Sequence, residues 1–128
     1  MTREEFIQIL DVEGYSYEIE GDKIIVTHKG SVDLSPLTSI PPGVVFENLG
    51  GVFLMDLTSI PPGVEFKNMD DVYLMNLTSL PPGVVFNNVE DVYLRSLTGG
   101  WLNEWKGNIE GINNKRLLNV MIKREMFI

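Results

Sequence analysis

Short runs of alternating hydrophobic and polar residues recur every 20 positions through the middle of the chain. From residue 37 to residue 96, each copy holds a Val-x-Phe run and then a Val-aromatic-Leu run. The three copies read LTSIPPGVVFENLGGVFLMD, LTSIPPGVEFKNMDDVYLMN and LTSLPPGVVFNNVEDVYLRS, and most positions are identical between consecutive copies. This period, which has no insertion, predicts a repeat protein in which each copy packs against its neighbours.

Each copy is expected to contain two strands and two corners. Both runs alternate with a period of two residues, which is typical of a half-buried strand. Pro-Pro-Gly predicts one corner, because proline fixes φ and glycine is free to turn. Gly50-Gly51, and the acidic pairs at the same place in the later copies, predict the other corner. We therefore predict a repeat solenoid, mainly β, in which parallel coils stack about 4.8 Å apart.

A degenerate copy of the repeat precedes the three clear ones. Ile24-Ile25-Val26 lies three repeat lengths before Val84-Val85-Phe86, and Val32-Asp33-Leu34 lies three repeat lengths before Val92-Tyr93-Leu94. The segment 17–96 is therefore expected to form four coils of one repeat each, the first of them degenerate. The inward rows predicted for the core are Leu37, Leu57, Leu77 and Leu97; Ile40, Ile60 and Leu80; Val44, Val64 and Val84; Phe46, Phe66 and Phe86; Val52, Val72 and Val92; and Leu54, Leu74 and Leu94.

Asparagine recurs where the Val-x-Phe strand ends, at Asn48, Asn68 and Asn88. A repeated asparagine at a solenoid corner hydrogen-bonds backbone groups that would otherwise be unpaired. We expect this role in preference to ligand binding. His28, the only histidine of the chain, occupies the same place in the degenerate copy. We expect it to close the corner there and not to act as a general base.

The N-terminal end carries a different pattern, which predicts an α-helical cap over residues 1–16. Thr2-x-x-Glu5 matches a capping box, and apolar residues at helical spacing follow it. We therefore expect a helix over about residues 3–12 and then a β-hairpin over residues 15–27.

The C-terminal end, residues 97–128, is likewise expected to be a helical cap, so that residues 1–128 form a single domain. Asn113 or Asn114 would begin a final helix with an apolar stripe. Trp101 and Trp105 are expected to plug the last coil. The alternative for these tryptophans is a platform on which a carbohydrate or a base stacks.

The repeats resemble a known family of solenoids. Met69-x-x-Val72-x-Leu74-x-x-Leu77-Thr78-Ser79-Leu80-Pro81 is similar to the LxxLxL…LTSLP pattern of leucine-rich repeats, and the resemblance covers roughly residues 30–97. It implies a leucine-rich-repeat-like solenoid. The family's asparagine is replaced here by leucine, and its convex segment by a second short strand, so a curved and a flat solenoid both stay open. The stretch LTSLPPGVVFNN also resembles small 20-residue-repeat proteins of bacterial and phage genomes.

Composition narrows the chemistry that the chain can carry out. It has 128 residues, a formal net charge of −8, one histidine and no cysteine. The negative charge opposes direct binding of nucleic acid, and the missing cysteines exclude disulfides and thiolate metal sites. No apolar run reaches the about 18 residues of a membrane span, and residues 1–14 lack the pattern of a secretion signal. We therefore expect a cytoplasmic protein that uses no metal, cofactor or membrane.

The middle residue of each Val-aromatic-Leu strand is expected to point outward. The candidate contact residues then form a row on one sheet face, consisting of Phe53, Tyr73 and Tyr93, with Met55, Met75 and Arg95 beside them. Such side chains suit protein recognition, although stacked aromatic residues also stabilise a sheet without any partner. The other strand would present Ile25, Val45, Glu65 and Val85, a largely apolar face that forms a second interface or lies under a cap.

Acidic residues gather at one corner of adjacent coils, at Asp70, Asp71, Glu90 and Asp91. Their spacing matches no calcium-binding loop. We interpret them as solvated charge that could also engage a basic groove on a nucleic-acid-binding protein.

Together these features predict a non-catalytic protein–protein interaction module and not an enzyme. A narrower hypothesis is an acidic inhibitor encoded by a phage or mobile element, of the anti-CRISPR or another anti-defence type. Its partner would be a host nucleic-acid-binding protein or nuclease. The alternative is a carbohydrate-binding or enzymatic domain that uses the tryptophans and the acidic corner.

Overall fold

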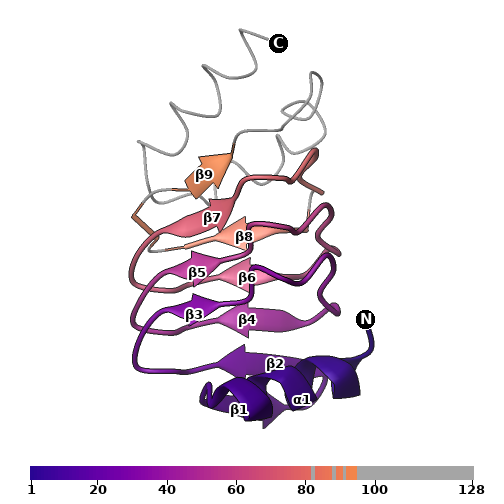
Figure 1. Cartoon of the computed structure of the whole chain (residues 1–128), viewed down its shortest axis with the longest axis vertical. Helices are drawn as coiled ribbons and strands as arrows, with labels where there is room; N and C mark the ends of the chain where they lie inside the picture. Colours follow the sequence, from indigo (N-terminus) through magenta and orange to yellow (C-terminus); the bar gives the residue numbers. More distant parts are fainter. Residues whose placement is uncertain (82, 88, 91, 95–128) are drawn as a thin grey trace, which may run out of the picture.

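Strands from successive repeats stack into two sheets in a computed structural model of the chain (Figure 1). The structure describes residues 1–81, 83–87, 89, 90 and 92–94. Sheet A has the strand order β1-β2-β4-β6-β8, and sheet B has the order β3-β5-β7-β9. Because the chain alternates between the two sheets, it follows about three turns of a β-solenoid. The predicted stack of β-coils is therefore confirmed.

One helix and nine strands make up the described part of the chain. Their bounds are α1 (Arg3–Glu13), β1 (Tyr17–Glu20), β2 (Lys23–Val26), β3 (Val32–Asp33), β4 (Val44–Phe46), β5 (Val52–Phe53), β6 (Glu65–Phe66), β7 (Val72–Leu74), β8 (Val85–Phe86) and β9 (Val92–Leu94).

The register between strands equals the repeat period of the sequence. In sheet A, Ile24 pairs with Val44, and Phe46 pairs with Phe66, each in parallel. In sheet B, Val52 pairs with Val72. The degenerate stretch supplies β2 and β3, which join the array in the same register. The pairing of β1 with β2 is antiparallel and forms the expected hairpin.

The core lies between the two sheets, where the period of two residues sends alternate side chains inward. The phenylalanine rings of β4, β6 and β8 stack on one another, with centroids 5.2 and 5.1 Å apart. Every described member of the predicted inward rows is buried except Leu37, which is half-buried in the first coil. Full burial of one such side chain stabilises the fold by about 1.5–3 kcal/mol, so the rows account for the stacking.

The Pro-Pro-Gly corner requires glycine in the first clear repeat. Gly43 has a φ of 81°, in the left-handed region that side chains rarely occupy. A Cβ at this position would also lie 2.8 Å from the carbonyl oxygen of Asp22 in the hairpin. The close approach of the two backbones is therefore possible only without a side chain.

The opposite corner is closed by buried asparagines. Asn48 Nδ2 donates to the carbonyl oxygens of Gly30, Gly50 and Gly51, each at 3.1 Å. Asn68 repeats the arrangement one coil later, where it bonds one carbonyl of the preceding coil and two of its own. The predicted structural role is confirmed at these two positions, whereas Asn88 lies outside the described residues.

Helix α1 begins and ends with specific caps. The Thr2 hydroxyl accepts a hydrogen bond from the backbone N–H of Glu5 at 3.1 Å, and the Glu5 carboxylate accepts one from the N–H of Thr2 at 3.3 Å. Gly14 ends the helix in the left-handed conformation. Phe6 and Leu10 are fully buried against the core. The expected N-terminal helix is thus confirmed.

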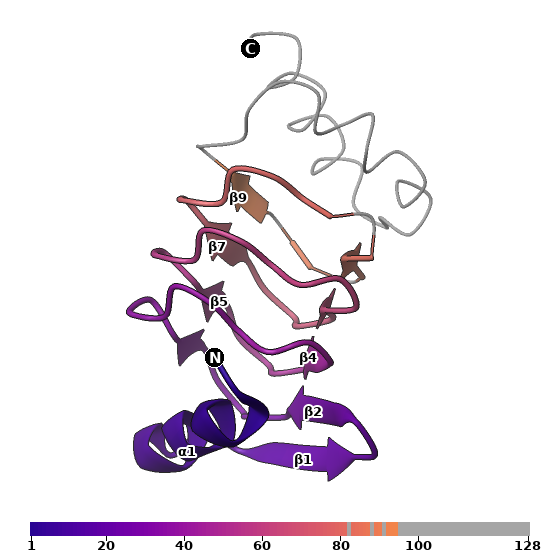
Figure 2. The same ribbon diagram turned by 90° about the vertical axis from the view of Figure 1, so that its right-hand side faces the viewer.

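The helix and the hairpin close the first end of the stack together. Seen from the side, α1 lies on the side of sheet B and the hairpin lies on the side of sheet A (Figure 2). The Tyr15 hydroxyl accepts a hydrogen bond at 3.0 Å from the backbone N–H of Asp33, at the open edge of β3. This contact protects an edge that would otherwise be free to pair with another chain.

The predicted C-terminal cap, with Trp101, Trp105 and the final helix, lies outside the described residues. Within the described part of the chain, no helix combines the length and the apolar character needed to cross a membrane.

Candidate protein-binding surface

The aromatic strip, formed by Phe53, Tyr73 and Tyr93, runs along the outer face of sheet B. Neighbouring rings are nearly parallel, with centroids 4.5 Å apart for the first pair and 4.7 Å apart for the second. Phe53 and Tyr73 are half-buried, and Tyr93 is 41% exposed. The strip is therefore a fixed array whose ring edges face solvent. Part of the apolar area of the three rings is already buried between them. This stacking is also what we expect if the rings only stabilise the sheet and bind no partner.

The acidic corner, formed by Asp70, Asp71, Glu90 and Asp91, precedes the strands that carry the tyrosines. Asp70 and Glu90 are exposed and Asp71 is half-buried, while Asp91 lies outside the described residues. The Asp70 carboxylate accepts a hydrogen bond from the N–H of Asp71 at 2.9 Å.

This acidic row cannot continue into the preceding coil. A Cβ on Gly50 would lie 2.6 Å from Ser31 Oγ, because the two loops are in close contact. The Ser31 hydroxyl in turn accepts a hydrogen bond from the N–H of Gly51 at 2.9 Å. Glycine at this corner is thus a packing requirement.

A hydrogen bond joins the aromatic strip to the acidic corner. The Tyr73 hydroxyl donates to Asp71 Oδ2 at 3.4 Å. Burial and the negative charge of Asp71 both raise the pKa of Tyr73 above its usual value. The hydrogen bond between Tyr73 and Asp71 thus makes the aromatic strip and the acidic corner one continuous surface.

The residues expected beside the strip are only partly placed. Met55 and Met75 follow β5 and β7, and both are half-buried. Arg95 lies outside the described residues.

Two exposed apolar residues were missed by the sequence reasoning. Leu49 is 58% exposed and Met69 is 61% exposed, at the corner just before the acidic positions. The leucine-rich-repeat resemblance included Met69 as the first apolar position of its motif, and Leu49 was assigned no role. The repeat position alone does not decide this exposure, because Val89, at the same place in the next copy, is buried.

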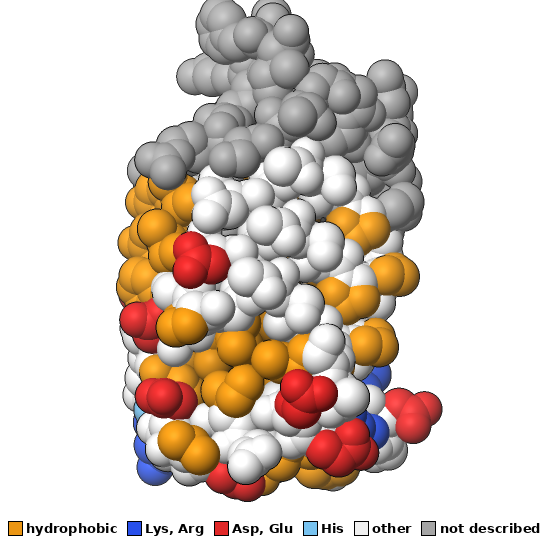
Figure 3. Space-filling model, turned by 45° about the vertical axis from the view of Figure 1, so that its right-hand side comes forward, with side chains coloured by type: hydrophobic (Ala, Val, Ile, Leu, Met, Phe, Trp, Pro, Cys, Tyr) orange, Lys and Arg blue, Asp and Glu red, His pale blue; other side chains and the backbone are white. Residues whose placement is uncertain are grey.

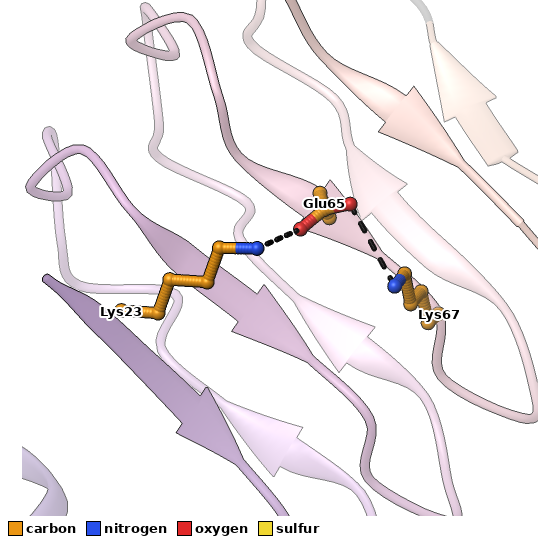
Figure 4. A network of polar contacts seen from close by, with 3 residues as sticks. All are labelled: Lys23, Glu65 and Lys67. Atoms are coloured by element: carbon orange, nitrogen blue, oxygen red, sulfur yellow. Dashed lines mark ion pairs between the residues drawn. The ribbon is translucent and has the colours of Figure 1, made fainter. Parts of the chain in front are cut away.

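The outer face of sheet A differs from the expected apolar interface. Ile25 and Val45 are only 7% and 3% exposed, and Val85 is half-buried. Lys23 reaches across β4 and pairs with Glu65 at 3.5 Å, and Lys67 pairs with the other oxygen of Glu65 at 3.7 Å (Figure 4). Of the two expectations for this face, an open interface and a covered face, the burial of Ile25 and Val45 favours the covered face.

His28 contributes to structure at the corner of the first coil. Its Nδ1 accepts a hydrogen bond from the N–H of Ser16 at 3.3 Å, and its ring meets the ring of Tyr15 edge-on with centroids 5.1 Å apart. Among the residues that the structure describes, no group of three or more His, Asp or Glu side chains could hold a metal ion.

Comparisons with protein-family models, with curated proteins and with solved structures give no match to this chain. Function is therefore argued from the surface itself.

Proposed function

We propose that the protein is a non-catalytic module that binds a protein partner through the outer face of sheet B. The observation that carries this proposal is the hydrogen bond between Tyr73 and Asp71, because it joins the aromatic strip and the acidic corner into one surface. Aromatic side chains supply contact area, and carboxylates beside them select the partner and speed its encounter.

The stacking of the strip favours this use. Rings held 4.5 and 4.7 Å from their neighbours lose little freedom when a partner covers them. Immobilising a free side chain at an interface costs about 0.5–1.5 kcal/mol, and a preformed strip avoids most of that loss. Tyr93 is the most exposed of the three rings, so we expect it to contribute the largest share of contact.

The decisive experiment measures affinity for the partner isolated with the wild-type protein. We expect the double variant Tyr73→Ser and Tyr93→Ser to bind at least about 30-fold more weakly, since central interface tyrosines often contribute about 2 kcal/mol or more. Loss of ring stacking should lower stability by only about 0.2–1 kcal/mol per pair. Tyr17→Ser, on the first strand of sheet A, is the matched control. Equal affinity of the double variant and the wild type would refute the proposal.

The narrower hypothesis of an acidic inhibitor, encoded by a phage or mobile element and directed at a host nucleic-acid-binding protein, adds a requirement for charge. It is supported by the net charge of −8 and by the exposed Asp70 and Glu90. Asp70→Lys with Glu90→Lys should then slow association with the partner, and added salt should weaken wild-type binding. An association rate that does not respond to salt would contradict the hypothesis of an acidic inhibitor. The broader proposal of a protein-binding module would still stand.

A further inference from the structure

A cavity of about 430 Å³ lies where α1 and Tyr15 meet the end of β3 and the segment that follows it. It adjoins the aromatic strip, because Asp33 on its wall pairs in register with Phe53 of the next coil. Toward this N-terminal end of the molecule, acidic side chains flank an apolar area of the surface (Figure 3). The cavity therefore lies next to the proposed contact surface, at the N-terminal end of sheet B.

The walls of the cavity are apolar and held in place. Leu34 at its base belongs to the buried core, and Leu37 and Ile9 pack against that core. The Tyr15 ring forms another wall. Its hydroxyl is bonded to the backbone of Asp33 at 3.0 Å and its ring contacts His28 at 5.1 Å, so two contacts fix its orientation.

Two carboxylates, those of Glu13 and Asp33, belong to the lining of the cavity, and both residues are exposed. Asp33 Oδ1 accepts a hydrogen bond from the N–H of Ser35 at 3.0 Å, which orients that carboxylate. In the part of the chain that the structure describes, the ion pairs involve Glu65 and neither of these two residues.

Residues 1–36 contain too few basic side chains to balance their acidic ones, which include Glu13 and Asp33. The Arg3 guanidinium donates to the carbonyl oxygen of Gly21 at 3.0 Å, and Lys23 forms its ion pair across sheet A. The third, Lys29, is exposed and belongs to neither of the ion pairs found among the described residues. Residues 1–36 hold eight acidic and three basic residues, a difference of −5. The cavity therefore lies in a segment with a clear excess of negative charge.

We propose that this cavity binds an arginine side chain of the partner, an assignment that rests on the proposed binding function. The apolar base accommodates the alkyl part of arginine, and the Tyr15 ring offers a surface on which a planar guanidinium stacks. The carboxylates of Glu13 and Asp33 accept its N–H groups in charge-assisted hydrogen bonds. Lysine fits less well, because its compact ammonium neither stacks nor forms paired hydrogen bonds.

The test needs no partner protein, because it uses a small probe with the isolated chain. N-acetyl-arginine-N-methylamide is titrated into labelled protein and amide chemical shifts are followed, with the citrulline analogue as the neutral ligand of the same shape. We expect saturable shifts confined to the neighbourhood of Tyr15, Asp33 and Leu37. We expect at least roughly tenfold weaker binding of the citrulline compound, which lacks the charge-assisted hydrogen bonds.

Isosteric variants locate the binding site within the chain. Glu13→Gln and Asp33→Asn should each weaken binding of the arginine probe several-fold, and Asp33→Asn keeps an oxygen that can accept from Ser35. Glu18→Gln, an exposed carboxylate on β1, should leave binding unchanged. Equal binding of both ligands, no saturable shifts, or equal effects of all three variants would overturn the arginine assignment. The proposed function would survive that result if the tyrosine variants still lose the partner.

Discussion

A single buried amide decides how neighbouring coils join at the corner that precedes sheet B. Asn68 Nδ2 lies 3.1 Å from the Gly50 carbonyl oxygen of the preceding coil and 3.1 and 3.2 Å from those of Asp70 and Asp71. Its Oδ1 is buried without a hydrogen-bond partner. The position therefore selects a donor, which asparagine supplies and aspartate at neutral pH does not.

Replacement of this amide gives a prediction at the residue scale. Asn68→Ala should lower the free energy of unfolding by about 1–3 kcal/mol, because buried carbonyl groups lose their donor. Asn68→Asp should lower it further at pH 7, since a carboxylate would face those carbonyl oxygens. Urea denaturation measures both effects, and Asn76→Ala, at an exposed position, should stay within about 0.5 kcal/mol of the wild type. A wild-type midpoint for Asn68→Asp would contradict the requirement for a donor at this position.

At the scale of elements, the two sheets follow one repeat but present different outer faces. Sheet B presents the stacked aromatic strip, whereas sheet A is crossed by the ion pairs of Glu65 with Lys23 and Lys67. In sheet A, Glu65 lies between Val45 and Val85 in register. We therefore expect Glu65, a charged residue within an apolar row, to oppose the pairing of this face with another copy.

This role of Glu65 is open to a direct test. Glu65→Val should change the free energy of unfolding by less than about 1 kcal/mol, because partly exposed ion pairs contribute about 0–1 kcal/mol. It should nevertheless increase self-association, since the row from Ile25 to Val85 becomes continuously apolar. Sedimentation velocity at several protein concentrations measures the association. Glu47→Gln, which removes one negative charge from the same face, is the control, and a monomeric Glu65→Val protein would contradict the prediction.

The core could be predicted from the sequence because two periods act together. The alternation along each strand determines which side chains point inward, and the repeat period determines which of them stack, as the burial of Phe46, Phe66 and Phe86 illustrates. The outward direction of Tyr73 followed from the same rule.

Other features could not be predicted, because they depend on contacts between residues outside the repeat pattern. The cover over Val45 depends on Lys23, whose side chain crosses a whole strand to reach Glu65. The cavity beside Asp33 depends on how α1 docks against β3, which no repeat position records. The stacking order of the coils can thus be predicted from the repeat. The exposure of each outer sheet face cannot, because it depends on long side chains and on the docking of the N-terminal helix.

At the scale of the whole molecule, the clear repeats stack as nearly equivalent units. Val52, Val72 and Val92 follow one another in a single register, so coils meet through nearly the same contacts at each step. Stability of such an array is close to a sum over coils and their interfaces.

Insertion of one extra copy of residues 57–76 directly after residue 76 tests this additivity. The longer protein should fold, melt at a higher temperature, and show a denaturant m-value larger by roughly 15%, in proportion to the added surface. The matched control is the same insert lacking one residue, which should destabilise the fold, because a one-residue slip turns inward side chains outward. Equal behaviour of the full and the shortened insert would contradict the additive array.

The near-identity of the copies has a consequence for how the chain reaches its fold. The strand Val44–Phe46 could pair with β8 almost as well as with β6, because the two sequences differ little. Synthesis from the N-terminus removes this ambiguity, since ribosomes add about 5–20 residues per second and a new copy therefore emerges only every one to four seconds or so. The hairpin of β1 and β2 forms within about 1–10 μs and offers an edge before the first clear repeat appears. During synthesis, each copy can therefore pair with the preceding copy before the next copy has been made. Refolding from denaturant imposes no such order, because all copies are present at once.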